Sequence, residues 1–509
     1  AGVPGIGVGP IRRLSEGPGD PVVGGPDQVV AAFDAAAAEL RRLAGSVPDA
    51  AAEIMTTTAL IADDPDLRAA ALAHLAAGRA AGDAVLAAAD TYAAMLAALP
   101  DPTLAARAAD VRQVARRVVG RLGTPAPVTA PDAAVIVIGD EVGADDLLEG
   151  AVAGAASRLG GSTAHVAIVA RALGVPVVFG IDPDGPGVAH GALAIVDGGA
   201  ATLTVAPGDA ELEAALTAAR ADTDRRRILA AGRDLPAITR DGRRIALLAN
   251  VATAAESAAA VAGGAEGAGL VRTELPFLDA AGWPTADAHL AALGPVIAGL
   301  GGRPATVRTL DFAPDKLPPF LAGRPARRCL ALMLAEPDTL VAQFAGTLAA
   351  AGGAPLRFLL PMVTAAAELD RGRLLLAAAA RRLGVAPPPL GAMVELAAAV
   401  DRVDELAEAA DFLSIGTNDL VADLLGIRDR TDPRLTPARA AEPVVVAAIG
   451  ATVRAAAKHH RPVSVCGDAA ADPAVVPLLL AAGCDTLSVA PPALDEVRAL
   501  IRSFPATRS

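Results

Sequence analysis

The second half of the chain alternates short apolar segments with spacers of helical length, and this alternation constrains the fold more than any other feature. Eight such segments follow one another between residue 235 and the end of the chain. They are 245–250, 267–271, 305–311, 356–361, 390–394, 412–415, 463–466 and 486–489. Eight strands that alternate with helices predict a closed (β/α)8 barrel, the TIM-barrel fold.

Polar side chains stand where several of these predicted strands end. They are Arg272, Arg308, Asp311, Glu395, Asn418, Asp419 and Cys466. The carboxyl ends of the strands meet on one face of a barrel, and active sites form there. We therefore expect these residues, which are far apart in the sequence, to share one pocket.

The first half of the chain predicts a helical block. From Asp27 to about Gly123, Ala, Leu, Arg and Asp recur with few glycines, which favours about four helices. The sequence Asp63–Asp66, which contains Pro65, predicts a helix start because carboxylates stabilise the positive end of the helix dipole. A proline-rich joint at 124–127 ends the block.

Around this block the sequence predicts a small α/β domain. The expected strands are 135–138, 175–180 and 194–196, with a helix over 160–173 and a strand and loop in 1–22. We expect residues 1–22 and 124–207 to form this multidomain protein's α/β domain, with the all-helical block 23–123 inserted in it. A charged linker helix at 208–234 then leads to the barrel at 235–509.

Composition narrows the classes of partner and compartment. The 44 Lys and Arg against 57 Asp and Glu leave a net charge of −13, which argues against nucleic acid or an anionic membrane as partner. Three cysteines in so long a chain argue against a disulfide framework and for a reducing, cytoplasmic compartment. We expect no membrane insertion and no secretory signal peptide, because no long uncharged apolar stretch is present.

The sharpest local motif is Gly160–Arg171, which reads GGSTAHVAIVAR. A flexible Gly-Gly turn places Thr163 and His165 at the start of an apolar helix, and a helix N-terminus favours anions. A neutral imidazole nitrogen is a nucleophile near pH 7, so His165 is suited to carry a phosphoryl group. Alternatively, His165 is a structural residue bonded to the backbone, and composition alone does not separate the two interpretations.

This motif resembles the phosphohistidine signature of the phosphoenolpyruvate-utilising enzymes, and the whole chain is similar to the enzyme I family of the phosphotransferase system. Residues 107–112 resemble its helical subdomain and residues 264–274 its first barrel signature. The resemblance implies transfer of a phosphoryl group from phosphoenolpyruvate to His165 and then to the phosphocarrier protein HPr, with release of pyruvate. It also implies Mg²⁺ as cofactor, a homodimer joined through the barrel, and a role as first step of sugar uptake.

The barrel residues suit this substrate, because phosphoenolpyruvate is a compact trianion that needs several cations. Arg272 and Arg308 end predicted strands, and Lys316 lies in a segment, DFAPDK, that resembles the family's D-x-G-G-D-K. By resemblance these three residues contact the phosphate and the carboxylate. A lone arginine at a strand end is more often a surface residue, but three cations on one face favour binding.

Two carboxylates follow neighbouring predicted strands, Glu395 in GAMVE and Asp419 in GTNDL. Hard oxygen ligands at a phosphate site suit Mg²⁺. The resemblance assigns both carboxylates to the metal, and Asn418 together with Asp419 to the substrate. The alternative for Asn418 and Asp419 is helix capping.

In the same family a cysteine at the position of Cys466 is the acid that protonates the methylene carbon of enolpyruvate. A thiol held near a metal and arginines has the tunable pKa that this task requires. The alternative is a small buried hydrophobic residue, which is the role that we expect for Cys329 and Cys484.

Some positions depart from the family pattern. Asp468 stands where the family has a glutamate, and Arg328 is the best match in a poorly kept segment. In Arg428-Asp429-Arg430 either arginine could bind substrate, and we assign Arg430. Two alternatives therefore stay open: an enzyme I of a nitrogen-related or dihydroxyacetone branch, and a non-catalytic regulatory protein.

Overall fold

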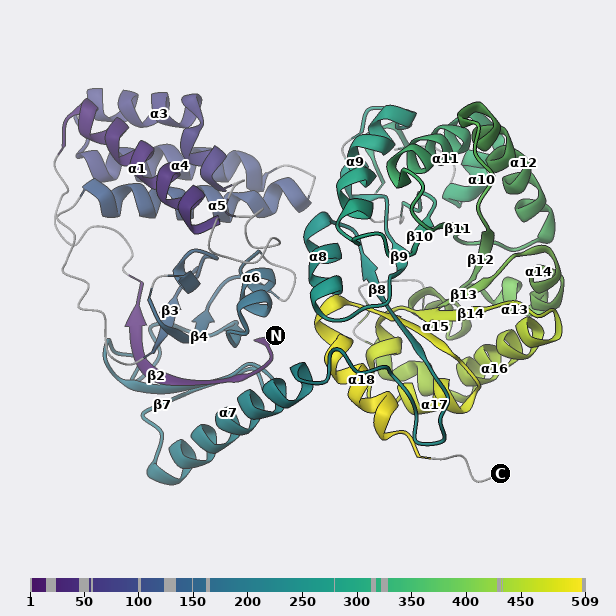
Figure 1. Ribbon diagram of the computed structural model, residues 1–509. Helices are drawn as coiled ribbons and strands as arrows, with labels where there is room; N and C mark the ends of the chain where they lie inside the picture. Colours follow the sequence, from purple (N-terminus) through teal and green to yellow (C-terminus); the bar gives the residue numbers. More distant parts are fainter. Residues whose placement is uncertain are drawn as a thin grey trace. The chain divides into compact units, whose positions relative to one another are not determined.

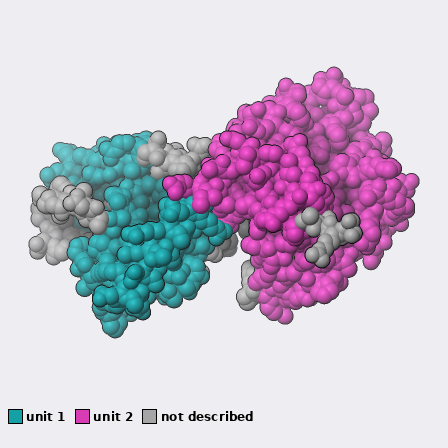
Figure 2. Space-filling view, turned by 60° about the horizontal axis from the view of Figure 1, so that its bottom comes forward, with its two compact units in different colours: residues 1–226 teal, residues 227–509 magenta. Residues whose placement is uncertain are grey.

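The computed structural model divides the chain into two compact units, residues 1–226 and 227–509 (Figure 2). The structure describes residues 2–14, 24–44, 55, 58–98, 102–122, 134–148, 150–161, 165–278, 280–312, 317–321, 328–427, 432 and 434–505. Each unit is described by itself below.

Unit 1 is built on a seven-stranded sheet with the order β1-β5-β4-β3-β2-β6-β7. The strands are β1 (Gly2–Val3), β2 (Ile6–Arg13), β3 (Val135–Gly139), β4 (Val152–Ser157), β5 (Val177–Phe179), β6 (Leu193–Asp197) and β7 (Thr202–Val205). The central strands β2 to β5 are parallel, while β1, β6 and β7 pair in antiparallel fashion. Strands β4 and β7 were not predicted from the sequence. In β4 the reason is its Val-Ala-Gly-Ala-Ala-Ser sequence, because small side chains give little apolar periodicity.

The helical block stands between β2 and the parallel strand β3 in the sequence, so it is an insertion into the α/β domain (Figure 1). Its described helices are α1 (Pro26–Ala44), α3 (Pro65–Ala76), α4 (Ala81–Ala97) and α5 (Pro102–Leu122). The predicted start of α3 is confirmed, because the Asp64 side chain accepts hydrogen bonds from the backbone N–H groups of Asp66 and Leu67. The predicted joint at 124–127 lies outside the described residues.

Two apolar cores cover the two faces of this sheet. Val137 belongs to a core that continues into the helical bundle and includes Phe33, whereas Ile136 and Ile138 belong to the core on the opposite face. This alternation follows from the two-residue period of a strand. Helix α6 (His165–Leu173) packs its apolar residues into the first core.

Helix α7 (Asp209–Ala230) follows β7, and the division between the two units falls within it. Only Ala215 of this helix is buried, and most of its other residues are charged or alanine. A helix that is polar on nearly all sides adds little to either core.

Unit 2 is a closed barrel of eight parallel strands, so the fold class predicted from the eight apolar segments is confirmed. The strands are β8 (Ala246–Val251), β9 (Ala268–Val271), β10 (Ala305–Arg308), β11 (Leu356–Leu360), β12 (Leu390–Val394), β13 (Leu413–Gly416), β14 (Val463–Cys466) and β15 (Thr486–Val489). Most of their residues are buried, which explains why they read as continuous apolar runs.

Helices surround the barrel in an outer ring (Figure 1). They are α8 (Ala254–Ala262), α9 (Ala286–Ala298), α10 (Cys329–Ala335), α11 (Pro337–Ala351), α12 (Ala366–Leu383), α13 (Ala397–Asp401), α14 (Val403–Ala409), α15 (Thr417–Leu424), α16 (Pro443–Lys458), α17 (Val476–Ala481) and α18 (Leu494–Ser503). Across the described parts of both units, no helix combines the length and apolarity needed to cross a bilayer.

Candidate functional site

The carboxyl ends of the barrel strands bring together residues that are distant in the sequence. Arg308 is the last residue of β10, Cys466 is the last residue of β14, and Glu395 directly follows β12. Gly416, at the end of β13, pairs in register with Cys466, and Asn418 and Asp419 lie in the first turn of α15. These are the positions at which TIM barrels carry function.

Arg308 is a buried cation between two carboxylates. Its guanidinium pairs with the Glu274 carboxylate, and its Nη1 lies 3.1 Å from Asp311 Oδ2. Burial by itself would lower the pKa of Arg308, but the charges of Glu274 and Asp311 outweigh burial and raise that pKa. Arg308 is therefore held charged, in a fixed position, at the end of the barrel.

Glu395 is only 2% exposed. Its Oε1 accepts the backbone N–H of Met362 at 2.6 Å, and Met362 adopts a left-handed φ of +53°. A Cβ on Gly416 would lie 2.7 Å from Glu395 Oε2, so only glycine leaves room for this carboxylate. Burial first, and then the charges of Asp311 and Asp419, raise the pKa of Glu395.

This arrangement fits a divalent cation. Glu395 is buried, the charges of Asp311 and Asp419 add to the cost of its negative charge, and a cation would offset that cost. Within the described ranges, no group of three His, Cys, Asp or Glu side chains surrounds one point. Glu395 and Asp419 are the carboxylates that would hold such an ion.

Asn418 and Asp468 hold each other across the ends of β13 and β14. Asn418 Nδ2 donates to Asp468 Oδ2 at 3.2 Å, and the backbone N–H of Asp468 donates to Asn418 Oδ1 at 2.9 Å. Both residues line a cavity of about 200 Å³, which Thr417 and Asp419 also line. The shorter side chain of Asp468 thus still reaches Asn418.

Cys466 is a buried thiol, 3% exposed. Ser414 Oγ donates to Cys466 Sγ at 3.8 Å, and Ser464 Oγ donates to Ser414 Oγ at 3.1 Å. Burial, followed by the charge of Glu395, raises the pKa of Cys466 to about 11, although Arg308 and Arg272 act in the opposite direction. Cys466 therefore keeps its proton at neutral pH and is a thiol rather than a thiolate.

The remaining sequence-predicted substrate residues differ in their positions. Arg272 is exposed, and its charge acts on Cys466. Arg328, before α10, pairs with Glu368 at 2.7 Å and donates to the carbonyl of Met362, the residue that binds Glu395. Lys316, Arg428 and Arg430 lie outside the described residues.

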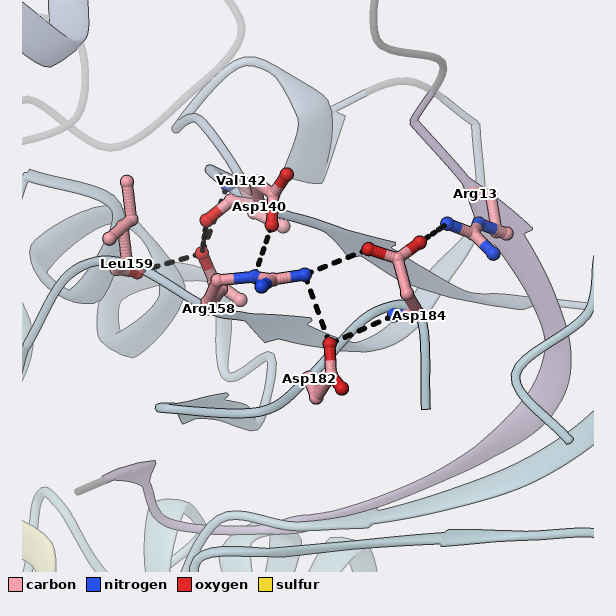
Figure 3. A network of polar contacts seen from close by, with 8 residues as sticks. Arg13, Asp140, Val142, Arg158, Leu159, Asp182 and Asp184 are labelled. Atoms are coloured by element: carbon pink, nitrogen blue, oxygen red, sulfur yellow. Dashed lines mark hydrogen bonds and ion pairs between the residues drawn. The ribbon is translucent and has the colours of Figure 1, made fainter. Parts of the chain in front are cut away.

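In unit 1, His165 is the first residue of α6, and its side chain lies outside the described part of the structure. The chain reaches it from β4 through Arg158 and Gly160, whose φ of +105° strongly favours glycine. Figure 3 shows that Arg158 lies among three carboxylates at this edge of the sheet. Its partners are Asp140, Asp182 (2.9 Å) and Asp184 (2.8 Å).

This network joins the carboxyl ends of the parallel strands. Arg13, the last residue of β2, pairs with Asp184 at 2.6 Å, and Asp140 follows β3 (Figure 3). No sequence motif predicted this network. The available signal was an aspartate soon after each of the strands β3 and β5.

Comparison with known proteins covers nearly the whole chain. Residues 226–505 match the phosphoenolpyruvate-binding domain of the PEP-utilising enzymes, residues 1–107 their N-terminal domain, and residues 123–201 their mobile domain. This chain belongs to the PEP-utilising enzyme family. The family predicted from the Gly160–Arg171 motif is therefore confirmed.

Relatives within this family carry two kinds of name. Multiphosphoryl transfer proteins of Rhodobacter capsulatus and Xanthomonas campestris pv. campestris are each 36% identical to this chain, over 86% and 98% of its length. The chain spans 54% and 62% of the lengths of those two proteins. A phosphoenolpyruvate-protein phosphotransferase of Streptomyces coelicolor is 34% identical over 93% of this chain and 86% of that protein.

For a PEP-utilising enzyme, three features of the site go beyond the sequence motifs. Glu274 neutralises Arg308, Ser414 contacts the Cys466 thiol, and Met362 directs its N–H at Glu395. Glu274 and Ser414 stand inside segments that the sequence analysis did single out, residues 264–274 and 412–415. Their contacts depend on neighbours from other strands, which no local pattern gives.

Proposed function

We propose that this chain is a phosphoenolpyruvate–protein phosphotransferase of the enzyme I type. It transfers the phosphoryl group of phosphoenolpyruvate to His165 and then to a histidine of an HPr-like phosphocarrier protein, releases pyruvate, and serves as first step of sugar uptake. The main support is the convergence of Arg308, Glu395, Asp419 and Cys466 at one end of the barrel.

Substrate binding follows from charge. Arg272 and Arg308 bind the phosphate and carboxylate, with Lys316, Arg328 and Arg430 as the further cations, and Asn418 positions the substrate. Glu395 and Asp419 hold Mg²⁺, which when bound neutralises charge on the phosphoryl group. Because Arg308 is already compensated by Glu274 and Asp311, its role is orientation more than added positive charge.

The transfer itself breaks the bond between phosphorus and the enol oxygen while a ring nitrogen of His165 bonds to phosphorus. Enolpyruvate is left, and Cys466 donates its thiol proton to the methylene carbon to give pyruvate. A buried thiol with a raised pKa suits an acid, because it holds the proton until a carbon base is bound against it. Ser414 orients the sulfur.

The remaining parts of the proposal concern assembly. We assign residues 1–22 and 124–207 to the phosphohistidine domain, 23–123 to docking of the carrier, 208–234 to the linker, and 235–509 to phosphoenolpyruvate binding. We further propose a homodimer joined through the barrel, and action in the cytoplasm. A net charge of −13 favours a carrier with a basic docking face.

Labelling with [³²P]phosphoenolpyruvate and Mg²⁺ tests this function. The wild-type chain should acquire acid-labile, base-stable label, and His165→Ala should acquire none. His190→Ala is the matched control, because His190 is an exposed histidine of the same unit and should label normally. Label that persists in His165→Ala would assign the acceptor to another residue.

The identity of the acceptor protein distinguishes this function from the alternative branches and from a regulatory protein. Purified carriers of the sugar, nitrogen-related and dihydroxyacetone branches are each added to labelled enzyme, and we expect rapid transfer to the sugar-branch HPr. Preferential transfer to another carrier would move the chain to that branch. A wild-type chain that takes up no label but binds a carrier would be the regulatory protein instead.

A further inference from the structure

A second cavity, of about 310 Å³, lies at the amino-terminal ends of the barrel strands, opposite the candidate active site. Its walls are mainly apolar and include Leu248, Leu413 and Val463. Arg357 of β11 lines it, and so does Ser464 of β14. Nothing in the proposed phosphotransfer uses this cavity.

Arg357 is the unusual member of this lining. It is half-buried, and its guanidinium carbon lies 4.9 Å from the centre of the Phe412 ring. Among the residues that the structure describes, none forms an ion pair or a hydrogen bond with the Arg357 guanidinium. Arg308, at the other end of the same barrel, has two carboxylate partners.

Partial burial weakens the hydration of this cation, so an anion that enters the cavity would interact with the guanidinium more strongly than in bulk water. Burial also lowers the pKa of Arg357. The cation–π contact with Phe412 holds the guanidinium at the cavity without using its N–H donors, so these donors are available to a ligand. An oxyanion bound edge-on by two parallel N–H···O bonds matches that fork.

The other residues that line the cavity limit the chemical class of ligand that it can bind. The apolar side chains would cover a hydrocarbon body, which a carboxylic acid has and inorganic phosphate lacks. Glu266 also lines the cavity, and Arg244 holds its carboxylate in place at 2.6 Å. Because Arg244 is already paired with Glu266, a second anionic group on the ligand would find no free cation among the described residues there.

We propose that the cavity at the amino-terminal ends of the barrel strands binds a small aliphatic monocarboxylate. Its carboxylate pairs with Arg357, and its hydrocarbon body packs against Leu248 and Val463. Phe412, which supports Arg357, belongs to the same apolar cluster as Cys466. A bound ligand would therefore contact the apolar cluster that contains Cys466. The binding itself does not depend on the proposed phosphotransfer.

Methyl NMR of the full chain, titrated with butyrate, tests this site. The methyl groups of Leu248 and Val463 line the cavity, and those of Val421 line the cavity near Asp419 at the opposite end. Butyrate should shift the Leu248 and Val463 signals saturably, and this response should survive Arg272→Ala. A response confined to Val421 would place the carboxylate at the candidate active site and overturn the proposal.

Three variants locate the charge. Arg357→Met should weaken butyrate binding at least about tenfold, the loss expected when a charge-assisted bidentate contact is removed. Arg357→Lys keeps the charge without the fork and should bind with intermediate affinity, and it carries the test if the Met variant does not fold. Arg371→Met is the control, because Arg371 is an exposed arginine of α12 and should behave as wild type.

The results that overturn the site are equally definite. Unshifted Leu248 and Val463 methyl groups in the wild type, or unchanged affinity in both Arg357 variants, would show that Arg357 binds no carboxylate. A parallel titration with inorganic phosphate distinguishes the two oxyanions. Shifts with phosphate but none with butyrate would overturn the assignment to a carboxylate.

Discussion

The two units hold their charged residues in opposite environments. In unit 1, Arg158 and its partners Asp182 and Asp184 form an exposed network beside the segment that leads to His165. In unit 2, Arg308 and Glu395 are buried at the strand ends. Exposed pairs are screened by water and salt, whereas buried charges interact strongly through a low dielectric.

The pKa shifts reflect this difference. In unit 1, a hydrogen bond from Arg13 is the main cause that lowers the pKa of Asp184, an ordinary surface effect. In unit 2, burial is the main cause that raises the pKa of both Glu395 and Cys466. Substitutions in the buried set should therefore change chemistry, while those in the exposed network should change little.

Glu395→Gln gives the largest expected effect. The amide keeps an acceptor for the Met362 N–H but removes the buried charge, so labelling from phosphoenolpyruvate should fall about 10³-fold or more. Transfer from labelled carrier back to His165 should continue, because in the proposed mechanism that step uses only unit 1. The exposed Glu405→Gln is the control, and equal loss in both directions would show that the units do not act separately.

Cys466→Ser should slow ketonisation of enolpyruvate on the enzyme by about 10²–10⁴-fold, since a hydroxyl is a far weaker acid than a thiol. Phosphorylation of His165 needs no proton at carbon and should be less affected. The measurement is the chirality of the pyruvate methyl group formed in isotopically labelled water. Retained stereospecificity at the wild-type rate would leave Cys466 as a packing residue.

His289→Leu tests how a buried titratable side chain, away from the candidate active site, makes stability depend on pH. His289 is fully buried against Phe277, and among the described residues neither ring nitrogen has a hydrogen-bond partner. Burial lowers the pKa of His289 to about 4, so between pH 6.5 and pH 4 the unfolded chain binds a proton that the folded chain does not. Acidification through this window should therefore remove about 3 kcal/mol of unit 2 stability.

Trp283 is the single tryptophan of the chain and lies in unit 2, so its fluorescence during urea unfolding reports that unit. The variant should lose the His289 part of the pH dependence between 6.5 and 4. Identical pH profiles for variant and wild type would mean that His289 is solvated in solution. The single tyrosine, Tyr92, reports unit 1, whose unfolding should not respond to this change.

Arg158→Met should have the smallest effect. It removes exposed ion pairs, so we expect back-transfer from labelled carrier to His165 to stay within about twofold of wild type, with an unchanged melting temperature. Rates measured at low and high salt supply the check, since screening should erase any residual difference. A loss as large as that of Glu395→Gln would mean that the network takes part in the transfer and that the comparison between units fails.

Local sequence patterns determined much of this protein. Eight runs of buried residues with helix-length spacers specified the barrel, because a strand that is covered on both faces reads as a continuous apolar segment. Asp64 before Pro65 specified the start of α3, since a helix cap depends on residues next to it in the chain. The Gly160–Arg171 motif specified the family.

Contacts between elements decided the rest. Two contacts join neighbouring strands of the barrel: Arg308 pairs with Glu274, and Ser414 contacts Cys466. The Arg357 guanidinium, by contrast, has no hydrogen-bond or ion-pair partner among the described residues. Burial and charge at such positions depend on which strands become neighbours and in what register. A side chain's own sequence context does not contain that information, so only the closed barrel distinguishes a compensated arginine from an uncompensated one.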